Sequence, residues 1–180
     1  MIAWSFVGIP WCVPACLGMA NVLKENNLLH IASGRARPPF NDEHVAMGRE
    51  LQKQTYANVQ NGEVQEMLAE YFADFTLTTW AVVFGYSLAE TTNTGVFQKH
   101  QVQLLLATAV AASGATRQAK SHMKGAMSLG VTVAGADAVL KAAKKINSWN
   151  NVEIKDIDAV TLDKELRVAQ LSSRSQHLLI

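Results

Sequence analysis

The segment from Phe97 to Gly114 constrains the fold more than any other part of the chain, because it is apolar on nearly every side of a helix. Its apolar residues include Val102, Leu104, Leu105, Leu106, Ala107, Ala109 and Val110. A helix that is hydrophobic all round has to be buried. We therefore expect other helices to enclose this segment in an all-α bundle.

The next segment, residues 115–130, predicts a helix with one buried histidine. One face of that helix carries Ala115, Ala119, His122, Ala126 and Leu129. His122 should therefore point inward among small apolar side chains. An imidazole there is either a core histidine with satisfied hydrogen bonds or an acid–base group in a pocket, since histidine titrates near neutral pH. Spacing alone leaves both alternatives open.

The length and composition of the chain predict one domain. A chain of 180 residues that is 49% hydrophobic is long enough for one well-buried core and too short for two ordinary domains. We expect a helical domain over residues 1–150 and a C-terminal extension over residues 151–180. In the extension, 152–160 is expected to be extended, 162–171 to form a short amphipathic helix, and the last nine residues to be loose.

Residues 1–23 carry no charged side chain and are nearly long enough to span a bilayer. Gly8, Pro10 and Pro14 interrupt this stretch, and no clear cleavage site follows it, so we expect a cytoplasmic protein without a membrane span. An apolar entry helix from about Trp11 to Lys24, within residues 1–27, is predicted to pack in the core or against another subunit. Contact with a membrane surface is the alternative.

The cysteines and histidines predict no metal site. Cys12 and Cys16 lie four residues apart in the apolar entry helix, which indicates two buried free thiols, with a redox pair as the alternative. The five histidines are scattered, and no phosphate-binding glycine loop is present. We therefore expect no cofactor. The net charge of only +1 does not favour nucleic acid as a partner.

The motifs around His122 follow a recognisable order. An apolar Ala/Leu helix is followed by Gly-x-x-Arg-Gln, by Ser-His-x-x-Gly-Ala and by Gly-Val-Thr at the start of another helix. This order resembles the carboxymuconolactone decarboxylase and alkylhydroperoxidase D-like superfamily over about residues 56–147. Residues 6–26 are more weakly similar to the entry helix of fungal members. The resemblance implies a homo-oligomeric helical bundle, commonly a trimer or hexamer, and a role in fungal secondary metabolism.

Peroxidase members of that superfamily use the pattern Glu-x11-Cys-x-x-Cys-x-x-x-His. Counted back from His122, this chain has Gln118 and Ala115 at the cysteine positions and Gln103 at the glutamate position. Peroxide reduction through a disulfide needs a thiolate nucleophile, so that chemistry is excluded. The resemblance leaves the cofactor-free chemistry of the decarboxylase branch.

That chemistry predicts a lyase or isomerase acting on a small oxygenated acid, lactone or natural-product intermediate. His122 would be the acid or base, and Gln103 and Gln118 would donate hydrogen bonds to an oxyanion. Trp80 and Tyr86 are expected to border the cavity, since each has an apolar body and a polar tip.

The entrance of the cavity is expected to involve His100, together with Glu90. Family members tend to carry Lys-x-Arg-Glu early in the apolar helix, where this chain has His100, Gln101, Val102 and Gln103. The loss of the Arg-Glu pair favours isomerisation, dehydration or cyclisation over the parent decarboxylation.

Two other function classes stay open. A catalytically silent binding or scaffold homologue would have His122 packed and hydrogen-bonded, with no cavity beside it. A membrane-associated partner subunit would use residues 1–23 for contact with lipid.

Overall fold

The computed structural model describes residues 2–32, 38–59, 62–154 and 157–177, and all regular secondary structure in these ranges is helical. This confirms the all-α expectation. Residues 33–39, Ser-Gly-Arg-Ala-Arg-Pro-Pro, have the composition of a linker and lie mostly outside the described residues. The elements in chain order are α1 (Trp4–Val7), α2 (Ile9–Glu25), α3 (Leu29–Ala32), α4 (Glu43–Tyr56), α5 (Gly62–Tyr71), α6 (Ala73–Thr78), the π-helix η1 (Thr79–Ala89), α7 (Glu90–Asn93), α8 (Lys99–Ala112), α9 (Thr116–Ser128), α10 (Val133–Trp149) and α11 (Ala159–His177).

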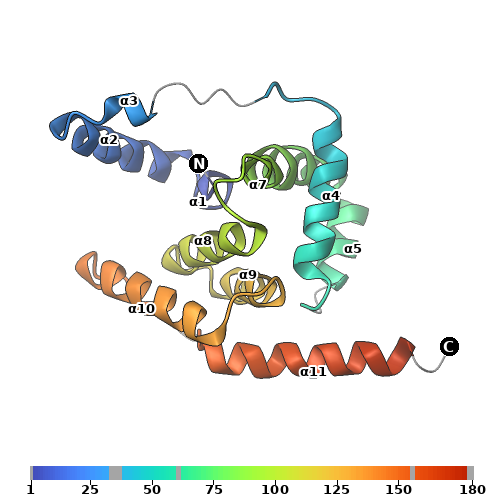
Figure 1. Ribbon diagram of the computed structural model, residues 1–180. Coiled ribbons are helices and arrows are strands. Elements are labelled where there is room, and N and C mark those ends of the chain that lie inside the picture. Colours follow the sequence, from blue (N-terminus) through green and yellow to red (C-terminus); the bar gives the residue numbers. More distant parts are fainter. Residues whose placement is uncertain (1, 33–37, 60–61, 155–156, 178–180) are drawn as a thin grey trace.

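The antiparallel pair α8 and α9 lies at the centre of the molecule, with α4 and α5 on one side and α10 and α11 below it (Figure 1). Val102, Leu106 and Val110 of α8 are buried, as the sequence pattern requires. Enclosure of α8 is incomplete, however, because Leu105 is 44% exposed. The expectation that other helices enclose α8 on all sides is therefore wrong for the face that carries Leu105.

Gly125 allows α9 to lie very close to the end of α4. A Cβ atom placed on Gly125 would be 2.8 Å from Thr55 Cγ2 and 2.9 Å from the Thr55 carbonyl oxygen. These distances are shorter than ordinary van der Waals contacts, so the two helices approach over a position that only glycine fits. The sequence predicts this close approach, because Gly125 lies three residues after the inward-facing His122 and has no Cβ.

Substitution of Gly125 by alanine should destabilise the protein by about 2 kcal/mol, since overpacking a tight helix contact typically costs 1–3 kcal/mol. Urea unfolding followed by circular dichroism measures this loss. Gly18→Ala is the control, because a Cβ at Gly18 would meet nothing within 4 Å. Equal stability of the two variants would contradict the contact with Thr55.

The segment before α8 is helical but divided earlier than the sequence suggests. The helix-spaced apolar residues of 64–90 predict two helical stretches with a bend near 74–79, but the break lies at Phe72, where the backbone has φ −135° and ψ 52°. The second part widens into the π-helix η1, whose Phe84, Gly85 and Leu88 are buried.

Helix α2 extends away from the rest of the molecule and is not part of its core (Figure 1). None of its 17 residues is buried. The expected packing of this helix in the core is therefore wrong. The prediction of buried thiols is also wrong, because Cys16 is exposed and Cys12 is only half-buried. Among the described residues, no helix is long and apolar enough to cross a membrane.

The C-terminal extension packs tightly against the bundle. The predicted apolar stripe of Leu162, Leu166 and Ala169 is buried against α9 and α10. Two details differ from the sequence-based expectation. Helix α11 begins at Ala159, within the stretch expected to be extended, and it continues to His177 instead of ending near Leu171.

Candidate functional site

Helix α9 places His122 in the interior, as its spacing predicts. His122 is 4% exposed, and its neighbours on the same face, Ala119 and Ala126, are fully enclosed. The imidazole ring packs edge-on against Phe6 of α1, with ring centroids 5.2 Å apart at 90°. The N-terminal helix α1 thus covers one side of the histidine.

Two polar side chains from distant parts of the chain meet the His122 ring. Gln103 of α8 lies with Oε1 3.3 Å from Nδ1. The Tyr56 hydroxyl at the end of α4 lies 3.2 Å from Nε2 and 3.3 Å from Nδ1. With Gln103 Oε1 facing the ring, this carbonyl oxygen can only accept, so in this arrangement Nδ1–H donates a hydrogen bond to Gln103. Nε2 is then the acceptor and receives the Tyr56 hydroxyl.

Gln103 has one further feature. Its Nε2 is a buried side-chain atom with no hydrogen-bond partner among the described residues, and Gln103 is completely inaccessible to solvent. An orphaned buried donor is uncommon in native proteins and often marks a catalytic or strained place. Gln103 therefore orients His122 at some cost in stability.

Burial changes the protonation of both ring partners. Desolvation lowers the pKa of His122 from 6.5 to about 4, so the imidazole is neutral at pH 7. Desolvation raises the pKa of Tyr56 well above its usual value, so the phenol keeps its proton. The pair therefore consists of a neutral base and a neutral hydrogen-bond donor. Because the imidazole is uncharged in the resting protein, it is not ready to act as an acid. Of the two roles expected from the sequence, acid or base, the burial of His122 favours the base.

The lowered pKa of His122 predicts a specific dependence of stability on pH. Between pH 6.5 and about 4 the unfolded chain binds a proton at His122 and the folded chain does not, so acid favours unfolding. The contribution is complete above pH 6.5 and is lost as the pH falls towards 4, by about 3 kcal/mol in total. Urea unfolding of the wild type and of His122→Gln across this range isolates it, because the other groups cancel in the difference. A difference that does not change with pH would contradict the buried, neutral imidazole.

A cavity of about 470 Å³ lies against His122 and Tyr56. Its wall is mainly apolar and aromatic and comes from α1, α4, α5, α6, η1 and α9, with Phe6, Val64, Met67, Leu68, Phe75 and Phe84. Gln52, Gln118 and Ser121 add neutral polar groups. Arg117 is the one cationic side chain among the described residues that line it, and it is exposed and pairs with Glu63 at 3.7 Å. The cavity suits a small, largely apolar ligand with few polar atoms.

The structure brings together some of the residues predicted for the site and separates others. Gln118 lines the cavity together with His122. Gln103 contacts the imidazole but is not a lining residue of the cavity. Trp80 lies in a neighbouring hollow, where its Nε1 donates to Gln52 Oε1 at 2.6 Å. Tyr86 packs elsewhere, against Phe40 and His44. His100 is half-buried in the first turn of α8 and is not a lining residue of the cavity.

Sequence reasoning missed the residues that give the site its character, namely Tyr56, Phe6 and Phe84. They lie on three separate helices, and Tyr56 is 66 residues from His122. No local spacing connects them. The signal that was available for Phe6 and Tyr56 is their aromatic type close to a helix end.

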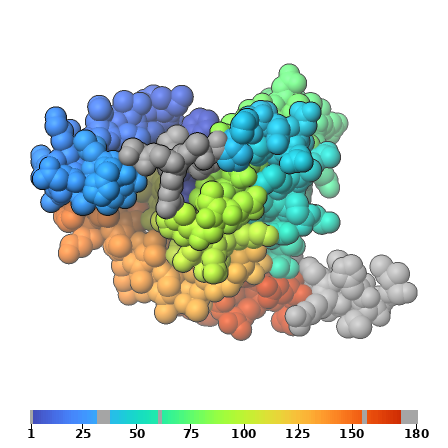
Figure 2. Space-filling model, turned by 45° about the horizontal axis from the view of Figure 1, so that its top comes forward, coloured from blue at the N-terminus to red at the C-terminus, as the bar shows by residue number. Residues whose placement is uncertain are grey.

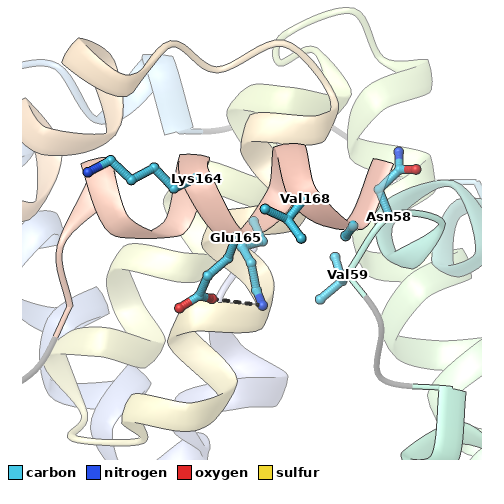
Figure 3. A pocket seen from close by; sticks show the side chains of 7 residues that line it. Asn58, Val59, Lys164, Glu165 and Val168 are labelled. Carbon is cyan, nitrogen blue, oxygen red and sulfur yellow. Dashed lines mark hydrogen bonds and ion pairs between the residues drawn. The ribbon is translucent and has the colours of Figure 1, made fainter. Parts of the chain in front are cut away.

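A second hollow, of about 430 Å³, lies beside α11 (Figure 3). Lys124 and Glu165 form an ion pair across it at 3.3 Å, and Lys164 points away from the pair. Its remaining wall is made by Asn58, Val59, Val168 and Ala169. The cavity at His122 is the better candidate, because burial shifts the pKa of both His122 and Tyr56 there. No cluster of metal-ligating side chains exists among the described residues.

Comparisons of the chain with protein-family models, with curated proteins and with solved structures gave no match. The resemblance to the carboxymuconolactone decarboxylase and alkylhydroperoxidase D-like superfamily therefore stays a prediction. The function has to be argued from the chemistry of the site.

Proposed function

We propose that this protein is a cofactor-independent isomerase that moves a proton within a small oxygenated lactone or ketone. The observation that carries the proposal is the neutral His122 imidazole beside the protonated Tyr56 phenol at an apolar cavity. A general base next to a donor for the developing enolate oxygen is what proton abstraction beside a carbonyl requires. The cavity also counts against a catalytically silent homologue, for which no void beside His122 is expected.

In the proposed reaction, the substrate carbonyl takes over the hydrogen bond that Tyr56 donates to Nε2 in the resting protein. The freed Nε2 lone pair then accepts a proton from the carbon between the carbonyl and a carbon–carbon double bond. The imidazolium exchanges this proton with solvent and delivers one proton to the far carbon of the dienolate, so that the double bond moves into conjugation and the atoms of substrate and product balance. A base with a pKa of about 4 to 5 suffices for such an activated proton when a phenol stabilises the enolate oxygen.

The substrate is better described as neutral than as carboxylated. Arg117, the one cation among the described lining residues, lies at the exposed rim and already faces Glu63. A carboxylate placed next to His122 would lose its hydration without a buried positive charge to replace it. Decarboxylation would also require a proton donor at the carbanion, and the resting imidazole is unprotonated.

The test uses a β,γ-unsaturated butenolide in deuterated buffer. We expect the ultraviolet absorbance of the conjugated isomer to rise, together with incorporation of deuterium at the far carbon. Tyr56→Phe should lower the rate by about 100- to 1,000-fold, since removing one oxyanion donor typically costs about 2.7–4 kcal/mol. The control is Tyr71→Phe, because Tyr71 is 68% exposed and does not line the cavity.

The matching carboxylated muconolactone should release no carbon dioxide above the buffer rate. Release of carbon dioxide that depends on His122 would show that the protein is a decarboxylase and not an isomerase. Turnover of neither compound would contradict the proposed proton transfer on lactones.

A further inference from the structure

Helix α2 exposes apolar side chains over most of its circumference. Six of them expose between 52% and 76% of their surface, namely Ile9, Trp11, Val13, Leu17, Met19 and Val22. The remaining strip carries Pro14, Gly18 and Asn21, and the charged residues Lys24 and Glu25 lie only at the C-terminal end. A helix that is apolar on so many sides requires enclosure.

The exposed surface of α2 is large enough for a stable interface. Six side chains of this size present on the order of 700 Å² of apolar surface, close to the roughly 800 Å² per partner of a standard interface. Monomeric proteins rarely expose contiguous apolar patches larger than a few hundred Å². The helix therefore has a partner, and the question is which one.

The charge pattern argues against two kinds of partner. A helix that lies in a membrane surface combines its apolar face with a strongly polar or charged face, usually rich in lysine and arginine. Helix α2 has only Lys24 and Glu25, side by side at one end. For the same reason, α2 offers no complementary charges to a partner protein with a strongly charged surface.

A second copy of this chain offers the matching surface. Leu105 of α8 and Ile146 and Trp149 of α10 are 44%, 52% and 71% exposed. Helices α2 and α10 lie on the same side of the molecule in both views, with α8 between them in the ribbon view (Figures 1 and 2). One copy thus presents α2 together with apolar groups of α8 and α10 on one side of the molecule, and a second copy can cover them with the same apolar groups.

We propose that α2 is the self-association helix of this protein. In the assembly, α2 of one copy packs against α2, α8 and α10 of a second copy around a two-fold axis, so that the same surface is buried on both chains. This interaction is independent of the proposed chemistry at His122.

Sedimentation of the full chain over a range of concentrations tests the proposal. We expect a dimer or a higher even oligomer for the wild type. Leu17→Glu should raise the dissociation constant by about 100-fold or more, because it buries an unpaired carboxylate in the interface. Val168→Glu is the matched control, since Val168 is 64% exposed on α11 compared with 61% for Leu17 on α2. It should leave the association unchanged.

Cys16, next to Leu17, supplies a second measurement in the unmodified protein. Its side chain is exposed in the single chain, so a bulky maleimide should react slowly with the associated wild type and rapidly with Leu17→Glu. Val22→Lys is a second variant with the same expectation, and circular dichroism verifies that both variants are folded. A monomeric wild type, an association that survives both variants, or binding of monomers to phosphatidylcholine vesicles would each overturn the proposal.

Discussion

Alanine in place of Gly85 is expected to leave little folded protein. A Cβ atom on Gly85 would lie 2.0 Å from the carbonyl oxygen of His44, and a Cβ on Gly48 would lie 1.8 Å from the carbonyl oxygen of Trp80. Both clashes are with backbone atoms, which cannot turn aside as the end of a flexible side chain can. Helices α4 and η1 therefore have to separate, and their contact is the most extensive between two helices in the described chain.

The expected loss for Gly85→Ala is more than about 4 kcal/mol, in the range that marks a specific structural defect. This is a large part of the 5–15 kcal/mol that typically stabilises a domain. Urea unfolding and the yield of soluble protein measure it, with Gly18→Ala as the control. Gly18 lies in the exposed helix α2, where alanine should be neutral or stabilising by up to about 1 kcal/mol. A Gly85→Ala protein within 1 kcal/mol of the wild type would show that α4 and η1 are farther apart.

Replacement of His122 by asparagine is expected to lower proton transfer on the butenolide by about 100- to 10,000-fold, the usual contribution of a general base. Asparagine keeps a polar side chain of similar reach but has no lone pair that can hold a proton. The fold should survive, because Gln103 can still bond to the new amide. Ultraviolet assays and deuterium incorporation at constant pH measure the effect.

His44→Asn is the matched control for this experiment. His44 is as deeply buried as His122, at 2% exposure, and also lies in a helix, but it packs against Phe40 and Tyr86. The same chemical change there should leave the rate per folded molecule within about two-fold of the wild type. Equal losses in the two variants would mean that buried histidines stabilise the fold and that neither is the base.

The position of His122 was predictable because it depends on local geometry alone. Residues three and four apart share a helix face, so the pattern of α9 fixes which side chains point inward. The same reasoning predicts the burial of Leu162 and Leu166. The close approach at Gly125 follows instead from its missing Cβ. The prediction for Trp80 and Tyr86 rests on residue type alone. Residue type does not say which cavity a side chain borders.

The sequence by itself determined the helical class, the inward direction of His122 and the absence of the peroxidase cysteines, because each of these follows from residue type and short-range spacing. Only the tertiary structure decided that Tyr56 and Gln103 meet the imidazole, that Phe6 covers it and that α2 is exposed. These features depend on how separate helices pack against one another. The neutral state of His122 belongs with them, because desolvation arises from the complete set of neighbours and not from the helix that carries the residue.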